Sequence, residues 1–321
     1  MRTTETTPEF EVAFEGDVER GRFVAPTAET RPAAEGSRLV VCTYNIRYAV
    51  GSFLISGSLL RRVGVSRPGR RASLVARHVA RAARALSDGR RMPPADLIAL
   101  QEADRETVRA GGRHVARELA RELRMDYAHA SMHHPRDVPP VQRQWWLNFE
   151  EQLRADDTGE TGVALLSRLP LEAVERIELP WSECRWRPRL ALAARVTAAG
   201  KRLHVFNSHI DPHAEAGNQI AQHEAVLARA EEVAAGGGPV LLLGDFNTLK
   251  RDSLAATRRL LESCGYTTPI PTGTPTWRAG LYRLHADWIF TRGARVLRWG
   301  VTRGLGTSDH WPVWAEVAIS D

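Results

Sequence analysis

The segment from Pro239 to Asn247, PVLLLGDFN, joins an apolar run to two polar residues that could do chemistry. Val240 to Leu243 are typical of a strand that is covered on both faces, and the run ends at Gly244. Glycine lets the chain turn there, so Asp245 and Asn247 are expected to project together beyond a sheet edge. A carboxylate and an amide in one cleft suit the orientation of a water molecule and the stabilisation of an oxyanion. The alternative is an ordinary turn, in which both residue types are common.

Polar residues also stand at the ends of other predicted strands. Asp287, in HADWIF, lies within an otherwise apolar strand, where a buried carboxylate is costly unless a partner such as histidine pairs with it. Any single one of these residues could be a helix cap or a turn residue, but their repeated placement at strand ends predicts one shared site. The others are Asn45 in TYNIR, Glu102 in LIALQE, His209 in NSHID, and Asp309 with His310 in TSDHWPV.

Composition bounds the function only loosely. The chain has 321 residues, of which 43% are hydrophobic, so it is long enough to bury a sizeable core. The formal charge of +6 would suit a polyanionic partner, but only Lys201 and Lys250 are lysines among the 44 basic residues. Such an arginine bias reflects coding composition as much as selection for nucleic acid, so the charge carries little weight.

Cysteines and apolar runs indicate the compartment. Cys42, Cys184 and Cys264 are widely spaced, with no pair at metal-ligand spacing, which favours free thiols in a reducing compartment. The N-terminal residues lack the apolar core of a signal peptide, and no stretch approaches the ~18 apolar residues that would span a bilayer. We therefore expect a soluble, cytoplasmic protein without stable membrane insertion.

The order of predicted elements indicates the fold class. Residues 1–36 are expected to form a poorly ordered arm, in which the alternation from Phe10 to Phe14 leaves room for a short edge strand. Residues 37–321 are expected to form one domain. Many strands separated by a few amphipathic helices favour an α+β fold with two packed sheets flanked by helices. Helices are predicted over residues 74–86, 107–124, 214–235 and 253–264, and further strands over residues 161–167, 190–197, 202–209, 286–291, 296–302 and 313–319.

Two loops are expected to carry specificity, because loops on a rigid scaffold commonly do so. They are the Gly- and Arg-rich loop at residues 50–72 and the irregular segment at residues 128–160. Trp145 and Trp146, in the second loop, could stack on a base or contact lipid, or could clamp the loop onto the body.

Several charged residues leave two interpretations open. The arginine face of the helix over residues 74–86 could be solvated or could bind nucleic acid. Asp211 could orient the nearby histidine or cap the following helix. Substrate phosphates could be bound by three arginines, which could equally lie in a solvated segment before a strand: Arg185, Arg187 and Arg189.

Taken in order, these stretches resemble the endonuclease/exonuclease/phosphatase family, which shares the deoxyribonuclease I-like fold. The resemblance extends from residue 38 to residue 319, and although GDFN and SDH are short, their ordered combination is specific. It implies a four-layer α/β/β/α sandwich of two mixed sheets, with the site at one edge and residues 37–321 as the catalytic domain. The matching stretches are TYNIR, LIALQE, TGVALLSRLP, HVFNSHID, LLLGDFN, HADWIF and TSDHWPV.

The resemblance also implies a reaction, the hydrolysis of a phosphate ester by in-line attack of an activated water. Asn45, Glu102 and Asp309 would hold a divalent cation, and such hard oxygen ligands suit Mg²⁺ or Mn²⁺ better than zinc. No organic cofactor is implied.

The remaining residues of the set would act on the phosphate ester. By the same resemblance, Asp245 would orient or deprotonate the water, and Asn247 would donate to phosphoryl oxygens. Asp287 would hold His310 and fix its tautomer, while His209 would donate to the phosphate or to the leaving oxygen. Either Asp245 or His310 could be the general base.

Two departures from the family bear on the substrate. In apurinic endonucleases of this family the first strand ends in the pattern Asn-x-Asp, whereas this chain has Asn45, Ile46 and Arg47 there. These endonucleases also tend to have a tyrosine at the position of His209. The chain is more similar to the histidine-bearing branches, which include deoxyribonuclease I, sphingomyelinases, inositol polyphosphate phosphatases and deadenylases. A DNA or RNA endonuclease of the same fold is the alternative function. A non-catalytic binding module would require gaps in the polar set, and the sequence shows none.

Overall fold

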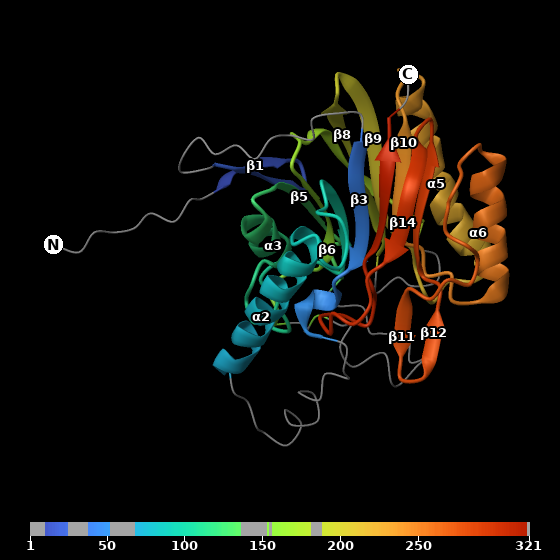
Figure 1. Ribbon diagram of the computed structural model, residues 1–321. Coiled ribbons are helices and arrows are strands. Elements are labelled where there is room, and N and C mark those ends of the chain that lie inside the picture. The colour runs from blue at the N-terminus through green and yellow to red at the C-terminus, as the bar shows by residue number, and fades with distance from the viewer. Residues whose placement is uncertain are drawn as a thin grey trace.

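The computed structural model describes residues 10–24, 38–51, 68–135, 153, 156–180 and 188–319. In these residues the chain forms two mixed β-sheets that pack face to face, and helices cover the outer side of each sheet (Figure 1). This arrangement is the four-layer α/β/β/α sandwich that the sequence predicts.

Apart from a separate two-stranded ribbon, the described strands fall into a larger and a smaller sheet. The larger sheet has the order β1 (Phe10–Glu15), β2 (Val18–Phe23), β5 (Asp126–Ser131), β6 (Gly162–Ser167), β4 (Leu97–Gln101), β3 (Arg38–Asn45), β15 (Val313–Ala318) and β14 (Arg295–Val301). The smaller sheet has the order β13 (Asp287–Arg292), β10 (Val240–Asp245), β9 (Lys201–His209), β8 (Leu190–Ala198) and β7 (Glu172–Glu178). Strands β3 and β4 are parallel, and so are β9 and β10, so the carboxyl ends of each pair share one sheet edge.

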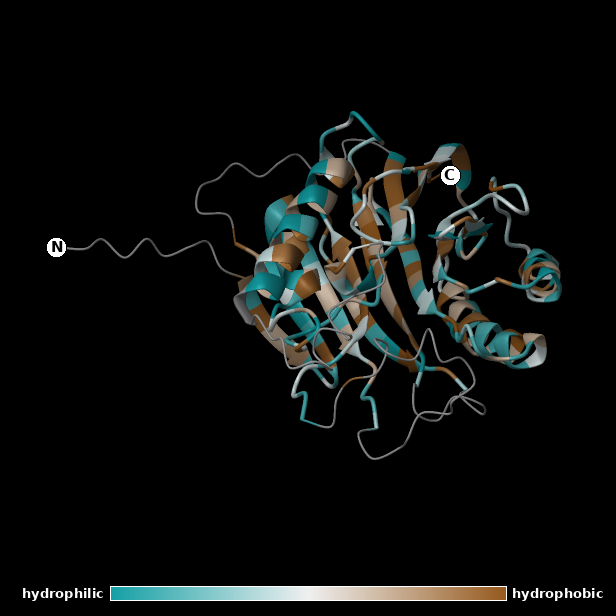
Figure 2. Ribbon diagram, turned by 90° about the horizontal axis from the view of Figure 1, so that it is seen from below, coloured by the Kyte–Doolittle hydropathy of each residue, from teal (hydrophilic) through white to brown (hydrophobic). Residues whose placement is uncertain are grey.

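Helices cover both sheets. The larger sheet packs under α2 (Pro68–Ser87) and α3 (Val115–Leu123), and the smaller under α5 (Ala216–Ala234) and α6 (Arg251–Ser263). Apolar side chains therefore meet in three layers, one between the sheets and one beneath each pair of helices. Figure 2 shows hydrophilic residues on the outward faces of the helices and hydrophobic strands between them.

The apolar runs of the sequence follow from this layering. In β3, Leu39 and Val41 point into the layer between the sheets, whereas Cys42 and Tyr44 pack in the layer under α2. Because successive side chains of a strand point to opposite faces, a strand covered on both faces is apolar at every position.

The N-terminal segment contains the short edge strand that the alternation from Phe10 to Phe14 left open, and the rest of the arm expected over residues 1–36 can be compared only at residues 15–24, because residues 1–9 and 25–36 lie outside the described residues. Residues 10–23 form the antiparallel pair β1 and β2, and β2 pairs with β5 from Val18 to Gly21. The buried carboxylate of Glu19 accepts a hydrogen bond from the Tyr127 hydroxyl at 2.5 Å, and the Phe10 ring meets the Tyr127 ring edge-on at 5.0 Å. The hairpin covers the backbone groups that β5 would otherwise expose at the sheet edge.

Two further boundaries differ from the sequence prediction. The helix expected over residues 107–124 begins only at Val115, because Gly111 and Gly112 adopt positive φ angles and Nδ1 of His114 caps the helix. The first residues of the segment 128–160 belong to β5. The tryptophan pair of that segment and most of the loop at 50–72 lie outside the described residues. Among the described helices, none is long and apolar enough to cross a membrane.

Candidate active site

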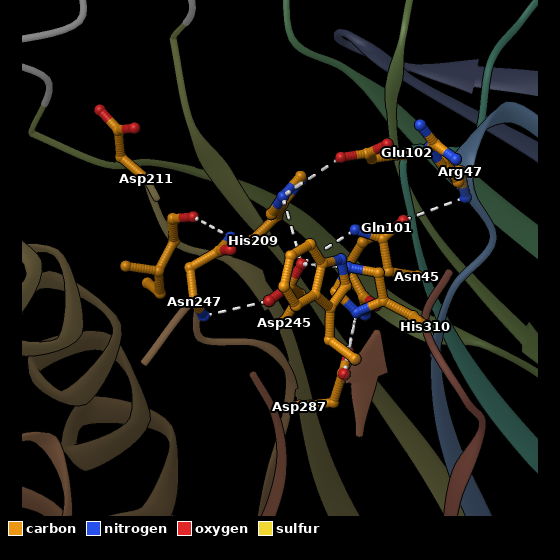
Figure 3. A network of polar contacts seen from close by, with 12 residues as sticks. Asn45, Arg47, Gln101, Glu102, His209, Asp211, Asp245, Asn247, Asp287 and His310 are labelled. Atoms are coloured by element: carbon orange, nitrogen blue, oxygen red, sulfur yellow. Dashed lines mark hydrogen bonds and ion pairs between the residues drawn. The ribbon is translucent and has the colours of Figure 1, made fainter. Parts of the chain in front are cut away.

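The polar residues at the strand ends meet at one edge of the two sheets. In the larger sheet, Asn45 stands opposite Gln101, which is followed by Glu102. In the smaller sheet, Asp245 stands opposite His209 on one side and opposite Asp287 on the other. Figure 3 shows these side chains gathered around Asp245, with His310 beside them. The prediction that distant segments converge on one site is consistent with this geometry.

Asp245 is the centre of the cluster. Its Oδ2 accepts a hydrogen bond from Nδ2 of Asn45 at 2.9 Å, and its Oδ1 accepts one from the backbone N–H of Asn247 at 3.0 Å. Nε2 of His209 lies 3.7 Å from Oδ2, and Nε2 of His310 lies 3.6 Å from the same oxygen. The carboxylate is thus fully buried between two imidazoles.

His310 and Asp287 form a hydrogen-bonded pair. Nδ1 of His310 lies 2.9 Å from Oδ2 of Asp287, which directs Nε2 toward Asp245. Burial alone would lower the pKa of His310, but the carboxylates of Asp287 and Asp245 outweigh it and raise the pKa. Burial raises the pKa of Asp245, and His310 opposes that rise. The two carboxylates therefore favour the protonated form of the imidazole.

The backbone around Asp245 explains the glycine and the asparagine of the GDFN motif. A Cβ on Gly244 would lie 2.0 Å from the carbonyl oxygen of Ser208 on the neighbouring strand β9, so only glycine fits. After Asp245 the chain turns, and Nδ2 of Asn247 donates to the carbonyl of Ile210 at 2.8 Å. These contacts join the carboxyl ends of β9 and β10.

Strained backbone is concentrated at the same edge. Positive φ angles cost energy in residues other than glycine, and residues with such angles tend to gather at functional sites. The turn after β3 is braced, because the Tyr48 N–H donates to the Glu102 carbonyl at 2.9 Å and the Arg109 guanidinium covers the Tyr48 ring at 3.4 Å. Residues at this edge with positive φ, between 46° and 57°, are Arg47, Tyr48, Ala49, Glu102 and Asn247.

The structure bears on the two interpretations that the sequence left open for Arg189 and for Asp211. Arg189 is fully buried, so it does not lie in a solvated segment. Its Nη1 lies 3.1 Å from both ring nitrogens of His209, which places the guanidinium over the ring face. Oδ1 of Asp211 accepts from the His213 N–H at 2.9 Å, so Asp211 stabilises a turn, and its carboxylate points away from His209 (Figure 3). Arg185 and Arg187 lie outside the described residues.

A buried amide pair beneath the site was missed by the sequence analysis. Nε2 of Gln101 donates to Oδ1 of Asn207 at 2.7 Å, which links β4 of one sheet to β9 of the other. Nδ2 of Asn207 donates to the carbonyls of Leu100 and Ala164, each at 2.8 Å. The signal was present in the sequence, since each amide interrupts an apolar strand one or two positions before Glu102 or His209.

Of the three residues expected to bind the metal, Glu102 and Asn45 offer oxygen donors that suit a hard divalent cation, whereas Asp309 is engaged elsewhere. Glu102 offers a carboxylate, and Oε1 of Glu102 lies 3.9 Å from Nε2 of His209. Oδ1 of Asn45 accepts from the Arg47 N–H at 3.0 Å and retains a second lone pair. Asp309, the third expected ligand, already accepts a hydrogen bond from the indole N–H of Trp277 at 3.1 Å.

A second group of possible ligands lies closer together. One donor atom each from Asp245, Asp287 and His310 falls within 4.8 Å of the others. Nδ1 of His310 is bonded to Asp287, and the two carboxylates raise the pKa of the imidazole, so this group suits proton transfer better than cation binding. Glu102 and Asn45 are the stronger candidates for the metal.

Known proteins share this architecture. The family model described as Endonuclease/Exonuclease/phosphatase family matches residues 42–310. An endonuclease/exonuclease/phosphatase from Beutenbergia cavernae is 18% identical with a TM-score of 0.58, over 88% of this chain and 71% of that chain. The catalytic domain of human Nocturnin with bound sulfate is 15% identical with a TM-score of 0.57, over 89% of this chain and 96% of that chain. A mannosyl-6-phosphatase of Bacteroides thetaiotaomicron is 15% identical with a TM-score of 0.54, over 87% and 99%.

A search of curated proteins found no match. At these low sequence identities, the similarity to the solved structures shows a shared fold and does not indicate the substrate of this chain. The family model, however, spans most of the chain and includes the converging residues from Asn45 to His310. The chain therefore belongs to the endonuclease/exonuclease/phosphatase family, whose members hydrolyse phosphate esters.

Proposed function

We propose that the protein is a divalent-metal-dependent phosphoric ester hydrolase that cleaves its substrate by in-line attack of an activated water. One observation carries the proposal: the buried Asp245 carboxylate lies 3.7 Å from His209 and 3.6 Å from His310, beside the oxygen donors of Glu102 and Asn45. A base, two imidazoles and hard oxygen ligands are the groups that this chemistry requires.

Asp245 is assigned as the general base that takes a proton from the attacking water. His310 is held by Asp287, and the two carboxylates beside it raise its pKa, so it is assigned to stabilise the charge on the phosphoryl group. On this proposal the general base is Asp245 and not His310.

The other groups position the phosphate. His209 donates to a phosphate or leaving oxygen, and the guanidinium of Arg189 adds a fixed positive charge beside it. Nδ2 of Asn247 uses one hydrogen on the Ile210 carbonyl and keeps the other for a phosphoryl oxygen. When bound, a Mg²⁺ or Mn²⁺ ion held by Glu102 and Asn45 would neutralise phosphate oxygens and the leaving group.

Hydrolysis is expected to depend on added metal. Treatment with a chelator should lower kcat on an activated phosphate ester by about 100-fold or more, because a bound cation supplies several kcal/mol of charge stabilisation. Readdition of Mg²⁺ or Mn²⁺ should restore the rate. The substrate panel should include an activated phosphodiester and phosphomonoester, plasmid DNA, RNA, sphingomyelin, inositol phosphates and a sugar 6-phosphate.

Full activity after removal of metal would contradict this proposal. Absence of both Mg²⁺ binding in calorimetry and turnover across the panel would instead support a non-catalytic binding module. The cytoplasmic location expected from the sequence stays a prediction.

A nucleic-acid substrate is the second candidate, and one surface favours it. Helix α2 contains no acidic residue, and its exposed side carries a row of arginines. Within the described part of the chain, none of them forms an ion pair with an acid. Such a row suits the phosphates of a polyanion. It consists of Arg70, Arg77, Arg81 and Arg84.

Neutralising part of this row tests the second candidate. If the substrate is DNA or RNA, replacing Arg77, Arg81 and Arg84 by glutamine should weaken binding and reduce the slope of log K against log salt by about 2.7. Binding titrations across salt concentrations give this slope. A control variant with Arg229→Gln and Arg258→Gln, on α5 and α6, should keep it. An unchanged slope in the α2 variant would exclude this surface from nucleic-acid binding.

A further inference from the structure

Asp309, which the resemblance assigns to the metal, has its carboxylate engaged by the chain's own donors. Its Oδ2 accepts the indole N–H of Trp277 at 3.1 Å and lies 3.6 Å from Nε of Arg47. Its Oδ1 lies 3.3 Å from the hydroxyl of Ser308. The side chains of Asp309 and Arg47 are only 15% and 19% exposed, so solvent screens their ion pair weakly.

The guanidinium of Arg47 is fixed in this position. Arg47 begins a turn of three consecutive residues with positive φ, and its Nη1 donates to the carbonyl of Gly51 at 3.0 Å. A divalent cation bound to Asp309 would lie beside this permanent positive charge, and repulsion between like charges is strongest where water is scarce. Arg47 thus neutralises the carboxylate that the metal would need.

The loop that contains Asp309 connects the parts of the site without a metal. The backbone N–H of Arg278, in β11 (Trp277–Ala279), donates to the Asp309 carbonyl at 2.9 Å. The hydroxyl of Ser308 donates to the Asn45 carbonyl at 2.7 Å and accepts from the His310 N–H at 3.1 Å. In Figure 1, β11 and its partner β12 (Tyr282–Leu284) form a ribbon beside this edge of the sheets.

We propose that Asp309 is a positioning residue and not a metal ligand. Paired with Arg47 and bonded to Trp277, it holds the turn after Asn45 and the loop that carries His310. The cation is then held by Glu102 and Asn45. This inference rests on the proposed function, because it concerns the metal of that reaction, but it departs from the ligand set that the family resemblance implies.

The test measures Mn²⁺ affinity directly, by electron paramagnetic resonance of the free ion during titration. The informative variant combines Arg47→Met with Asp309→Asn, because it removes one positive and one negative charge together. Its Mn²⁺ affinity is expected to stay within about threefold of wild type, because the Asn45 side chain stays bonded to Asp245 at 2.9 Å, whereas kcat should fall because the loop that carries His310 is held less firmly. Glu102→Gln, in contrast, removes a proposed ligand and should weaken Mn²⁺ binding by about tenfold or more.

A loss of tenfold or more in the folded double variant, matching that of Glu102→Gln, would overturn the inference and leave the hydrolase proposal intact. Failure of the wild-type protein to bind Mn²⁺ would overturn both. A second measurement avoids dependence on the variant's folding: the Mn²⁺ position in wild-type crystals, located by anomalous scattering. The inference requires contact with Glu102 and Asn45, and direct contact with Asp309 would sink it.

Discussion

Replacing Asp245 by asparagine is expected to lower kcat/KM for a phosphate ester by about 10²–10⁴-fold, the contribution of a positioned general base. Asparagine has nearly the same shape, and its Oδ1 would still accept the Asn247 N–H bond that now measures 3.0 Å. The variant loses the charge, the ability to take a proton from water, and the hydrogen bond that Oδ2 accepts from Asn45 at 2.9 Å. Steady-state kinetics on the substrate found in the panel, together with the free energy of unfolding, give the two quantities needed.

Asp211→Asn is the matched control for this experiment. Asp211 is buried nearby, but its Oδ1 caps a turn by accepting the His213 N–H, and asparagine stabilises such turns equally well. Its kcat/KM should stay within about threefold of wild type, because no reacting group is removed. Equal losses in both variants would mean that the buried charge in this region matters only for structure. Near-normal activity of Asp245→Asn would remove Asp245 from the role of base.

Gly244→Ala is expected to reduce the free energy of unfolding by about 3 kcal/mol or more, the upper range for overpacking a rigid site. The added Cβ would lie 2.0 Å from the backbone carbonyl of Ser208, and a backbone atom in a sheet interior cannot move aside as a flexible side chain does. Strand β9 would have to shift away from β10, and His209 would move with it. Denaturant titration followed by circular dichroism measures the change.

The control for that substitution is Gly217→Ala in α5. A Cβ at Gly217 meets no atom within 4 Å, and alanine is the better helix former, so its stability should change by no more than about 1 kcal/mol, in the stabilising direction. If Gly244→Ala cost no more than this control, the contact between β9 and β10 would be looser than the structure indicates.

The strand-end residues could be predicted because their signal is local. Each follows an apolar run, and a continuous run indicates a strand covered on both faces, as in β10. The cost of burying an unpaired carboxylate predicted a histidine partner for Asp287, and the family resemblance implied that this partner is His310. These rules need no knowledge of which strands are neighbours.

The unpredicted features depend on strand neighbours. Gln101 and Asn207 are 106 positions apart, and their bond exists only because β4 and β9 face each other across the core. The ion pair of Arg47 with Asp309 requires β3 and β15 to be adjacent, which the antiparallel register establishes. Local patterns likewise could not show that β2 would extend the sheet beyond β5, since that edge becomes available only after β5 and β6 have paired.

The pairing of β3 with β15 has a consequence for the newly made chain. Asn45 closes one of the earliest strands, whereas His310 immediately precedes β15, the last strand of the larger sheet in chain order. On the ribosome, Asn45, Glu102 and His209 are translated well before the histidine that completes the set. On the proposed assignment, a polypeptide that stops short of His310 lacks a complete centre, and hydrolysis is expected to begin only after β15 has emerged from the ribosome and docked on β3.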